Sequence, residues 1–196
     1  ETLSFINHSD TYLNINLFQV FNSNESDYIT LYLEQYIQWT NPISTKRINC
    51  TYGDEGLVYE IKFGGYGSRP LSVIKRKVIS WESLPILLIL NKISTLLTDQ
   101  IYNICVAMCY PNGKIGINAH KDKEMSKGTT ICGWSFGSER TLVMGPPKYI
   151  KTNPIHISLP SGSVYEFKPP TNDHWTHCIE KDHTIDKRIS LTFRNY

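Results

Sequence analysis

Two short motifs contain residues that could bind a metal ion. His120 and Asp122 are two residues apart, so on an extended segment both side chains emerge on the same face and can reach one ion. His177, further along the chain, offers a third ligand. Two histidines and one carboxylate form the facial triad of non-haem Fe(II) oxygenases, which leaves coordination positions open for other ligands.

Two arginines close to the end of the chain could bind an anionic ligand. Arg188 and Arg194 are six residues apart and therefore share a face of a strand. A guanidinium group binds a carboxylate through two parallel hydrogen bonds. The pair implies a ligand with two carboxylates.

The elements that would position these residues change in type near residue 100. Apolar spacing predicts a helix over 27–39 behind a Ser26/Asp27 cap, and a second helix that Ser83 caps, with Pro85 in its first turn. Short β-like runs broken by Gly, Pro and Asn follow, and they favour a sandwich or jelly roll over a parallel sheet. These runs are 103–110, 129–136, 140–144, 155–159, 163–167, 174–179 and 188–194.

Composition is that of one globular domain of 196 residues, with 40% hydrophobic and 19% charged residues. The five cysteines are odd in number and contain no C-x-x-C pair, which excludes a disulfide framework and a zinc ribbon. The most apolar run, 84–90, is shorter than the ~18 residues of a membrane span. We expect a soluble monomer of the nucleus or cytoplasm; the first residue, Glu1, leaves open a preceding segment.

Charge is unevenly distributed along the chain. Residues 1–45 contain no Lys or Arg, whereas residues 46–196 hold all twenty Lys and Arg against thirteen Asp and Glu, a surplus of seven positive charges. Such a surplus suits a partner that carries phosphates, although a solvated surface rich in lysine is the more ordinary explanation.

Six motifs in a fixed order resemble the AlkB-type dioxygenases, which depend on 2-oxoglutarate and Fe(II). The last two look closest to the homologue that repairs duplex DNA in animals. The motifs are Tyr52-Gly53-Asp54, Tyr110-Pro111-Asn112-Gly113, His120-Lys121-Asp122-Lys123-Glu124, Ser135-Phe136-Gly137, Pro170-Thr171-Asn172-Asp173-His174-Trp175-Thr176-His177 and Arg188-Ile189-Ser190-Leu191-Thr192-Phe193-Arg194.

The resemblance implies an α+β fold, a double-stranded β-helix (jelly roll) core with two flanking helices. One dioxygenase domain would span 1–196, with a helical and nucleotide-recognition region in 1–100 and the catalytic core in 101–196. The cofactors would be Fe(II), 2-oxoglutarate and O2. The reaction would be oxidative demethylation of N-alkylated bases in DNA or RNA, which releases formaldehyde, succinate and CO2.

The resemblance also implies roles for individual residues. His120, Asp122 and His177 would hold iron and carry the catalysis. The 2-oxoglutarate site would comprise Tyr110, Arg188, Ser190 and Arg194, although Ser190 and Met108 stand where the family usually has Asn. His174 would lie outside the metal shell, because on a strand it faces away from His177.

A base whose Watson–Crick edge is methylated must be flipped or already single-stranded, so aromatic and basic contacts are needed. The candidate contacts are Trp39 as a wedge, Arg47, Tyr59 as a lid and Glu124 as a reader of the base, with Lys75-Arg76-Lys77 nearby. Core packing explains Trp39 and Tyr59 equally well. An oxygenase of this fold that acts on a protein or small molecule stays an alternative, and a protein that only binds is disfavoured by the intact triad and arginine pair.

Overall fold

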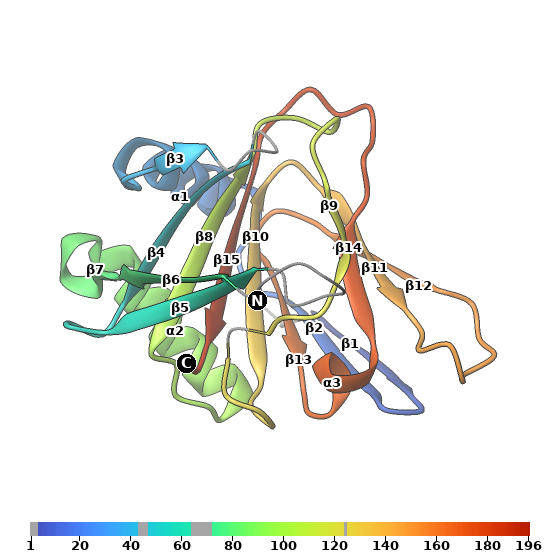
Figure 1. The fold of residues 1–196 in the computed structure, drawn as a ribbon. Coiled ribbons are helices and arrows are strands. Elements are labelled where there is room, and N and C mark those ends of the chain that lie inside the picture. The colour runs from blue at the N-terminus through green and yellow to red at the C-terminus, as the bar shows by residue number, and fades with distance from the viewer. Residues whose placement is uncertain (1–3, 43–46, 64–71, 124) are drawn as a thin grey trace.

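Two facing β-sheets form the centre of the computed structural model, which describes residues 4–42, 47–63, 72–123 and 125–196 (Figure 1). The larger sheet has the strand order β1-β2-β13-β10-β15-β8-β4-β3, with β7 paired to β4. Its strands are β1 (Ser4–Asp10), β2 (Leu13–Gln19), β3 (Thr40–Pro42), β4 (Ile48–Gly53), β7 (Ile79–Ser80), β8 (Ile104–Tyr110), β10 (Ile131–Gly137), β13 (Ser163–Phe167) and β15 (Arg188–Arg194).

The smaller sheet has the order β12-β11-β14-β9 and faces the larger one. Its strands are β9 (Ile117–His120), β11 (Arg140–Gly145), β12 (Ile155–Leu159) and β14 (Thr176–Ile179). A separate antiparallel hairpin consists of β5 (Val58–Phe63) and β6 (Ser72–Lys77). The antiparallel two-sheet arrangement with few helices confirms the predicted α+β jelly roll.

The helices are α1 (Ser23–Tyr36), α2 (Pro85–Thr98), the short α3 (Thr171–His174) and a 3-10 turn, η1 (Trp81–Ser83). In Figure 1, α1 and α2 lie on the side of the larger sheet that is turned away from the smaller one. The longest described helices have 14 residues, fewer than the roughly 20 that a bilayer span requires.

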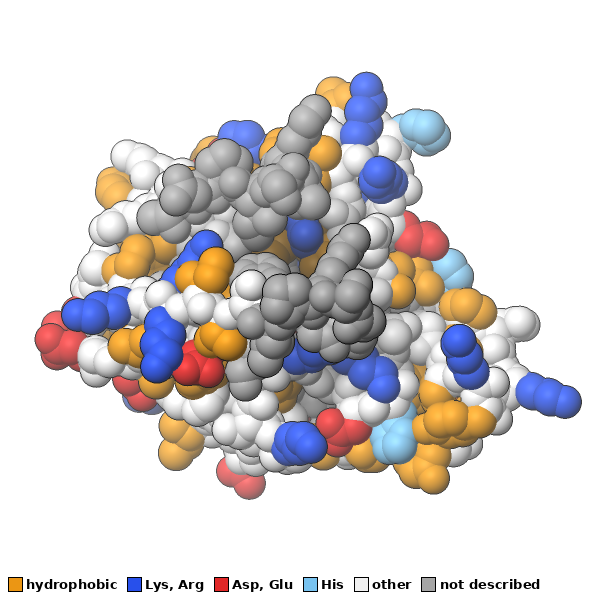
Figure 2. Space-filling view, in the orientation of Figure 1, with side chains coloured by type: hydrophobic (Ala, Val, Ile, Leu, Met, Phe, Trp, Pro, Cys, Tyr) orange, Lys and Arg blue, Asp and Glu red, His pale blue; other side chains and the backbone are white. Residues whose placement is uncertain are grey.

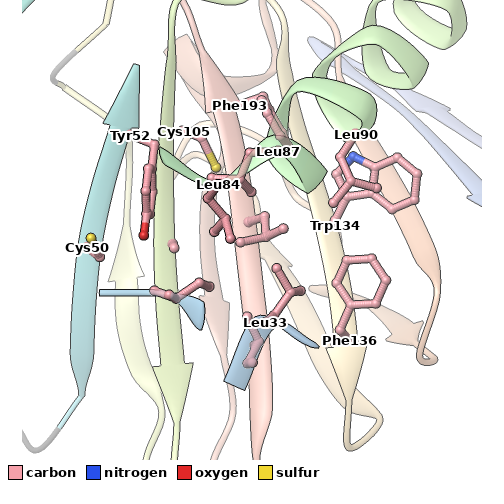
Figure 3. Packing of buried hydrophobic residues seen from close by; sticks show 14 of the residues in the cluster. Leu33, Cys50, Tyr52, Leu84, Leu87, Leu90, Cys105, Trp134, Phe136 and Phe193 are labelled. Carbon is pink, nitrogen blue, oxygen red and sulfur yellow. The ribbon is translucent and has the colours of Figure 1, made fainter. Parts of the chain in front are cut away.

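One apolar core lies between α1, α2 and the larger sheet. Strand residues Cys105, Trp134 and Phe193 point toward Leu33 of α1 and Leu87 of α2, and all five are fully buried (Figure 3). The indole of Trp134 also donates a hydrogen bond to Ser94 of α2 at 2.8 Å. The helices therefore cover one face of the larger sheet and leave its other face to the smaller sheet.

A second apolar core fills the space between the two sheets. Strand β2 contributes Leu13, Ile15 and Leu17, which alternate with polar residues as expected for a strand with one buried face. Leu142 of β11 and Trp175 belong to the same cluster. The larger sheet therefore has a packed apolar core on each of its faces.

The helix boundaries correct two details of the sequence analysis. Helix α1 begins four residues earlier than expected, because Asn22 caps it and Glu25 completes a capping box, whereas Ser26 is buried. Helix α2 begins at Pro85 as expected, but Ser83 bonds to Ser80 O instead of capping it. The apolar spacing located both helices, and competing local hydrogen bonds decided the caps.

Two further differences concern strands. The first hundred residues, expected to be helical, also supply seven strands, and β2 and β4 pair directly with β13 and β8 of the core. The expected strand over 174–179 begins only at Thr176, because residues 171–174 form α3. His174 therefore lies at the end of a short helix, not on a strand.

Candidate active site

Pairing of β9 with β14 brings two distant histidines together. His120 at the end of β9 and His177 in β14 are directly opposite in the register, and their ring centroids are 4.3 Å apart. Asp122 follows His120 by two residues, just beyond the strand. Asn172 of α3 holds its backbone through two hydrogen bonds, accepting from Asp122 N at 2.9 Å and donating to Asp122 O at 2.8 Å.

The three side chains have the geometry of a metal site. Asp122 Oδ1 lies 3.5 Å from His120 Nε2, and its Oδ2 lies 3.9 Å from His177 Nε2. One ligand atom from each residue falls within 4.8 Å of the other two, and among the described residues this is the group that could hold a metal ion. His120 Nδ1 bonds to Asn118 O at 2.8 Å, so Nε2 is the nitrogen available to a metal.

The charges in this cluster favour metal binding. Burial alone would raise the pKa of Asp122, but Arg194, with its Nη2 at 2.9 Å from Asp122 Oδ2, holds the pKa below its usual range. Burial lowers the pKa of His177 to about 4. At neutral pH Asp122 is therefore ionised and His177 is neutral, which are the forms that bind metals.

Strand β15 presents two arginines to the space between the sheets. Arg188, Ser190, Thr192 and Arg194 face this space, whereas Ile189, Leu191 and Phe193 face the helices. This alternation confirms the shared face that the spacing of Arg188 and Arg194 predicts. The interior set, together with Met108, Tyr110, Tyr165 and His177, lines a cavity of about 50 Å³.

Arg188 is buried, and no carboxylate of the described residues forms an ion pair with it. It is 1% exposed, its Nε donates to Ser135 Oγ at 2.9 Å, and its Nη1 has no hydrogen-bond partner among the described residues. The Tyr110 ring lies 5.3 Å from its guanidinium carbon. Because an unpaired buried charge is costly, this group fits a site that an anionic ligand completes. The cavity beside the triad thus fits a dicarboxylate such as 2-oxoglutarate.

Close packing shapes the floor of this cavity. Gly133 of β10 is opposite Tyr165 of β13, and a Cβ at Gly133 would lie 2.1 Å from Tyr165 Cζ. Any larger residue would push the Tyr165 ring into the ligand space. Ser135 and Asn172 also support the site, and although both lie inside motifs of the sequence, only the structure gives them their partners.

A second cavity, of about 200 Å³, reaches two residues of the triad. Tyr59 and Ile61 of the hairpin strand β5 line it, and so do His120, Asp122 and Arg194. Tyr59 is buried, and its hydroxyl is 2.9 Å from Thr51 Oγ1. The structure therefore brings Tyr59 to the triad, where a substrate would have to bind.

The remaining predicted contacts are placed differently. Trp39 is half-buried and packs against the cluster between the helices and the larger sheet, so its role as a wedge stays a prediction. Arg47 donates to Met108 Sδ at 3.5 Å. Glu124 lies outside the described residues. His174 does not join the metal cluster.

Comparisons with known proteins agree with this geometry. Residues 22–194 match the sequence model of a family described as the 2OG-Fe(II) oxygenase superfamily. No curated protein sequence matches the chain. The solved structure of OsALKBH1 is similar over 97% of this chain and 100% of that chain, with a TM-score of 0.59 and 14% sequence identity. At this identity the likeness shows the fold.

Proposed function

The chain belongs to the 2OG-Fe(II) oxygenase superfamily, and we propose that within it this enzyme oxidatively demethylates N-alkylated bases of nucleic acids. The family uses Fe(II), 2-oxoglutarate and O2, and His120, Asp122 and His177 fit the iron. Bound together, these groups supply oxidation of a C–H bond coupled to decarboxylation of 2-oxoglutarate. An N-methyl group, O2 and 2-oxoglutarate would give N–H, formaldehyde, succinate and CO2.

The arginines of β15 orient the cosubstrate in this proposal. Arg188, buried and without a counter-ion, binds the distal carboxylate at the closed end of the cavity, beside Tyr110. Arg194 lies next to Asp122 and is near the carboxylate that adjoins the keto group. Ser190 and Met108 are cross-strand partners on the same wall and complete the cavity. One cation at each end matches the two carboxylates of 2-oxoglutarate, and the keto group beside one of them distinguishes the end at the triad.

The wall formed by Tyr59 is the observation that favours a base as the substrate. An aromatic side chain in the same cavity as His120 and Asp122 offers a stacking surface for a planar ring. On the neighbouring strand, Arg76 is directly opposite Tyr59, and all residues of β6 are exposed, including Lys75 and Lys77. An aromatic wall beside exposed cations is typical of single-stranded nucleic acid binding.

Product analysis tests this proposal. Oligonucleotides of DNA and of RNA with one N-methylated base would be incubated with the enzyme, Fe(II) and 2-oxoglutarate, as single strands and as duplexes. We expect loss of the methyl group and release of formaldehyde in equal amounts. Turnover of 2-oxoglutarate without loss of methyl from any strand would instead favour a protein or a small molecule as substrate.

Two variants refine the test. Trp39→Ala should cost more activity on duplexes than on single strands if its ring fills the gap left by a flipped base, because only the duplex requires unstacking, a few kcal/mol per step. An equal loss on both would assign Trp39 to the core alone. Tyr28→Ala is the matched control, since Tyr28 is an aromatic residue of α1 with 72% exposure.

A further inference from the structure

Three aromatic rings from distant parts of the chain meet on the surface. They are Tyr12 in the β1–β2 turn, Tyr149 in the loop between β11 and β12, and His174 at the end of α3. The rings of Tyr12 and His174 stack with centroids 4.1 Å apart at 15°, and Tyr149 Oη lies 2.6 Å from His174 Nδ1. Tyr12 is 47% and Tyr149 65% exposed, so the cluster is ordered by its own contacts while large ring areas face solvent.

The backbone conformation at Tyr12 indicates that the tyrosine ring has a role beyond forming the turn. Its φ of 59° lies in the left-handed region, where a bulky residue is strained and glycine is not. A hydrogen bond anchors the backbone of this turn, since the buried Trp175 donates from Nε1 to Thr11 O at 2.9 Å. A tyrosine in this position costs stability and adds little burial, so its ring is better explained by a surface role.

Hydrogen bonds link the segment of Asp122 to α3, where the aromatic cluster begins. Asn172 bonds to the backbone of Asp122, and Lys121 Nζ donates to Asp173 O at 2.6 Å. These four residues line a cavity of about 280 Å³. Asp173 is the residue before His174, so the aromatic cluster is adjacent in sequence to this lining.

The surroundings of the cluster are basic. Lys127 lines the cavity, Lys148 precedes Tyr149, and Lys151 follows it; all three are exposed, and none makes an ion pair with a described residue. The acidic residues closest to the cluster in sequence are Asp10 and Asp173. On the face that Figure 2 presents, Lys and Arg side chains predominate over Asp and Glu side chains. A polyanion would be attracted to it.

We propose that Tyr12, His174 and Tyr149 form a docking surface for nucleotides that flank the one in the active site, and that the neighbouring lysines contact their phosphates. Exposed rings that stack successive bases beside backbone-binding cations are the usual means of holding single strands. The inference rests on the proposed function, because it extends the path of the same strand. It assigns this strand a direction, from the triad along Lys121 toward the β1–β2 turn.

Steady-state kinetics with two substrate lengths test the proposal. A methylated trinucleotide fills the active site alone, whereas a longer methylated strand also reaches the aromatic cluster. Tyr12→Gly and Tyr149→Ala should raise the KM for the longer strand about five- to hundredfold, from the loss of base stacking, and leave its kcat unchanged. The KM for the trinucleotide should not change. Tyr12→Gly suits the left-handed backbone, so the variant should fold; Tyr28→Ala is the control.

Each other outcome overturns the inference in a recognisable way. Equal losses on both substrates would mean that the rings only support the fold. Unchanged kinetics on the longer strand would remove the docking surface and leave the proposed function intact. If polyglutamate competed with the methylated strand as well as an unmethylated strand does, the surface would recognise only charge. If the unaltered enzyme demethylates no oligonucleotide, the proposed function fails together with this inference.

Discussion

Replacing Arg188 by Met should weaken binding of the cosubstrate without lowering the stability of the fold. The side chain is 1% exposed, and its guanidinium has Ser135 Oγ at 2.9 Å and the Tyr110 ring at 5.3 Å, but no carboxylate. Burial lowers the pKa of Arg188, because removal from water disfavours the charged guanidinium. Met fills a similar unbranched volume without the charge, so the core should close around it.

The two expected effects have opposite signs. Two charge-assisted hydrogen bonds to a carboxylate, each worth about 1.5–3 kcal/mol, would be lost, which predicts a rise of at least about a hundredfold in the Kd for 2-oxoglutarate. The free energy of unfolding of the protein without cosubstrate should stay the same or rise by about 1 kcal/mol, because an apolar residue replaces a buried charge that lacks a partner ion.

Calorimetric titration and urea unfolding measure these two quantities. The protein loaded with Mn(II), which resists oxidation, is titrated with 2-oxoglutarate and unfolded with and without it. At a concentration about a hundredfold above the Kd of the unaltered protein, the ligand should stabilise that protein by about 2.7 kcal/mol and the variant by at most about 0.4 kcal/mol. If Arg188→Met kept this stabilisation, Arg188 would not bind the cosubstrate.

Arg140 provides the matched control, since it is the other fully buried arginine among the described residues. Its Nε pairs with Asp182 Oδ2 at 2.7 Å, and its Nη2 donates to Ile115 O at 3.1 Å and to Glu180 O. Arg140→Met should therefore lower the free energy of unfolding by about 3 kcal/mol and leave the Kd for 2-oxoglutarate unchanged. The same substitution would then have opposite consequences at two buried sites.

Three further predictions follow from the described contacts. His177→Ala should abolish Mn(II) binding in calorimetry with little change in the free energy of unfolding, whereas His156→Ala, at an exposed histidine, should bind the metal normally; the reverse would refute the ligand set. Tyr59→Ala should lower demethylation of single strands and duplexes alike and leave Thr51 without its hydroxyl partner; undiminished activity on both would remove Tyr59 from the substrate wall. Burial raises the pKa of Glu166. At pH values above the usual pKa of Glu, the folded state therefore binds more protons than the unfolded state. The free energy of unfolding then falls as pH rises through the folded-state pKa. Glu166→Gln should then raise the free energy of unfolding near pH 7 and change it little near pH 4, and equal effects at both values would contradict this origin.

The spacing of residues within single segments of the sequence predicted much of the site. Alternation along 188–194 puts Arg188 and Arg194 on one face, and the spacing of His120 and Asp122 keeps both near one point even though the strand ends at His120. Apolar spacing likewise located α1 and α2. These features depend on residues a few positions apart, whose geometry the backbone fixes without reference to the rest of the chain.

Features that join distant segments depended on the tertiary structure. Leu13, Ile15 and Leu17 carry a strand pattern, but whether β2 extends the core depended on its pairing with β13, some 150 residues away. Strand β6 has no buried face and is stabilised as a strand by its pairing with β5.

The same holds for the chemistry of individual side chains. Arg140 and Arg188 are both arginines at the start of a β-strand, yet Asp182 neutralises the first, while the second has no counter-ion in the described part of the chain. Likewise, the sequence contains no pattern that links Tyr12 with His174. Register, burial and the arrangement of the loops bring such groups together, because these result from packing the whole chain at once, whereas a sequence pattern reports only the geometry of its own segment.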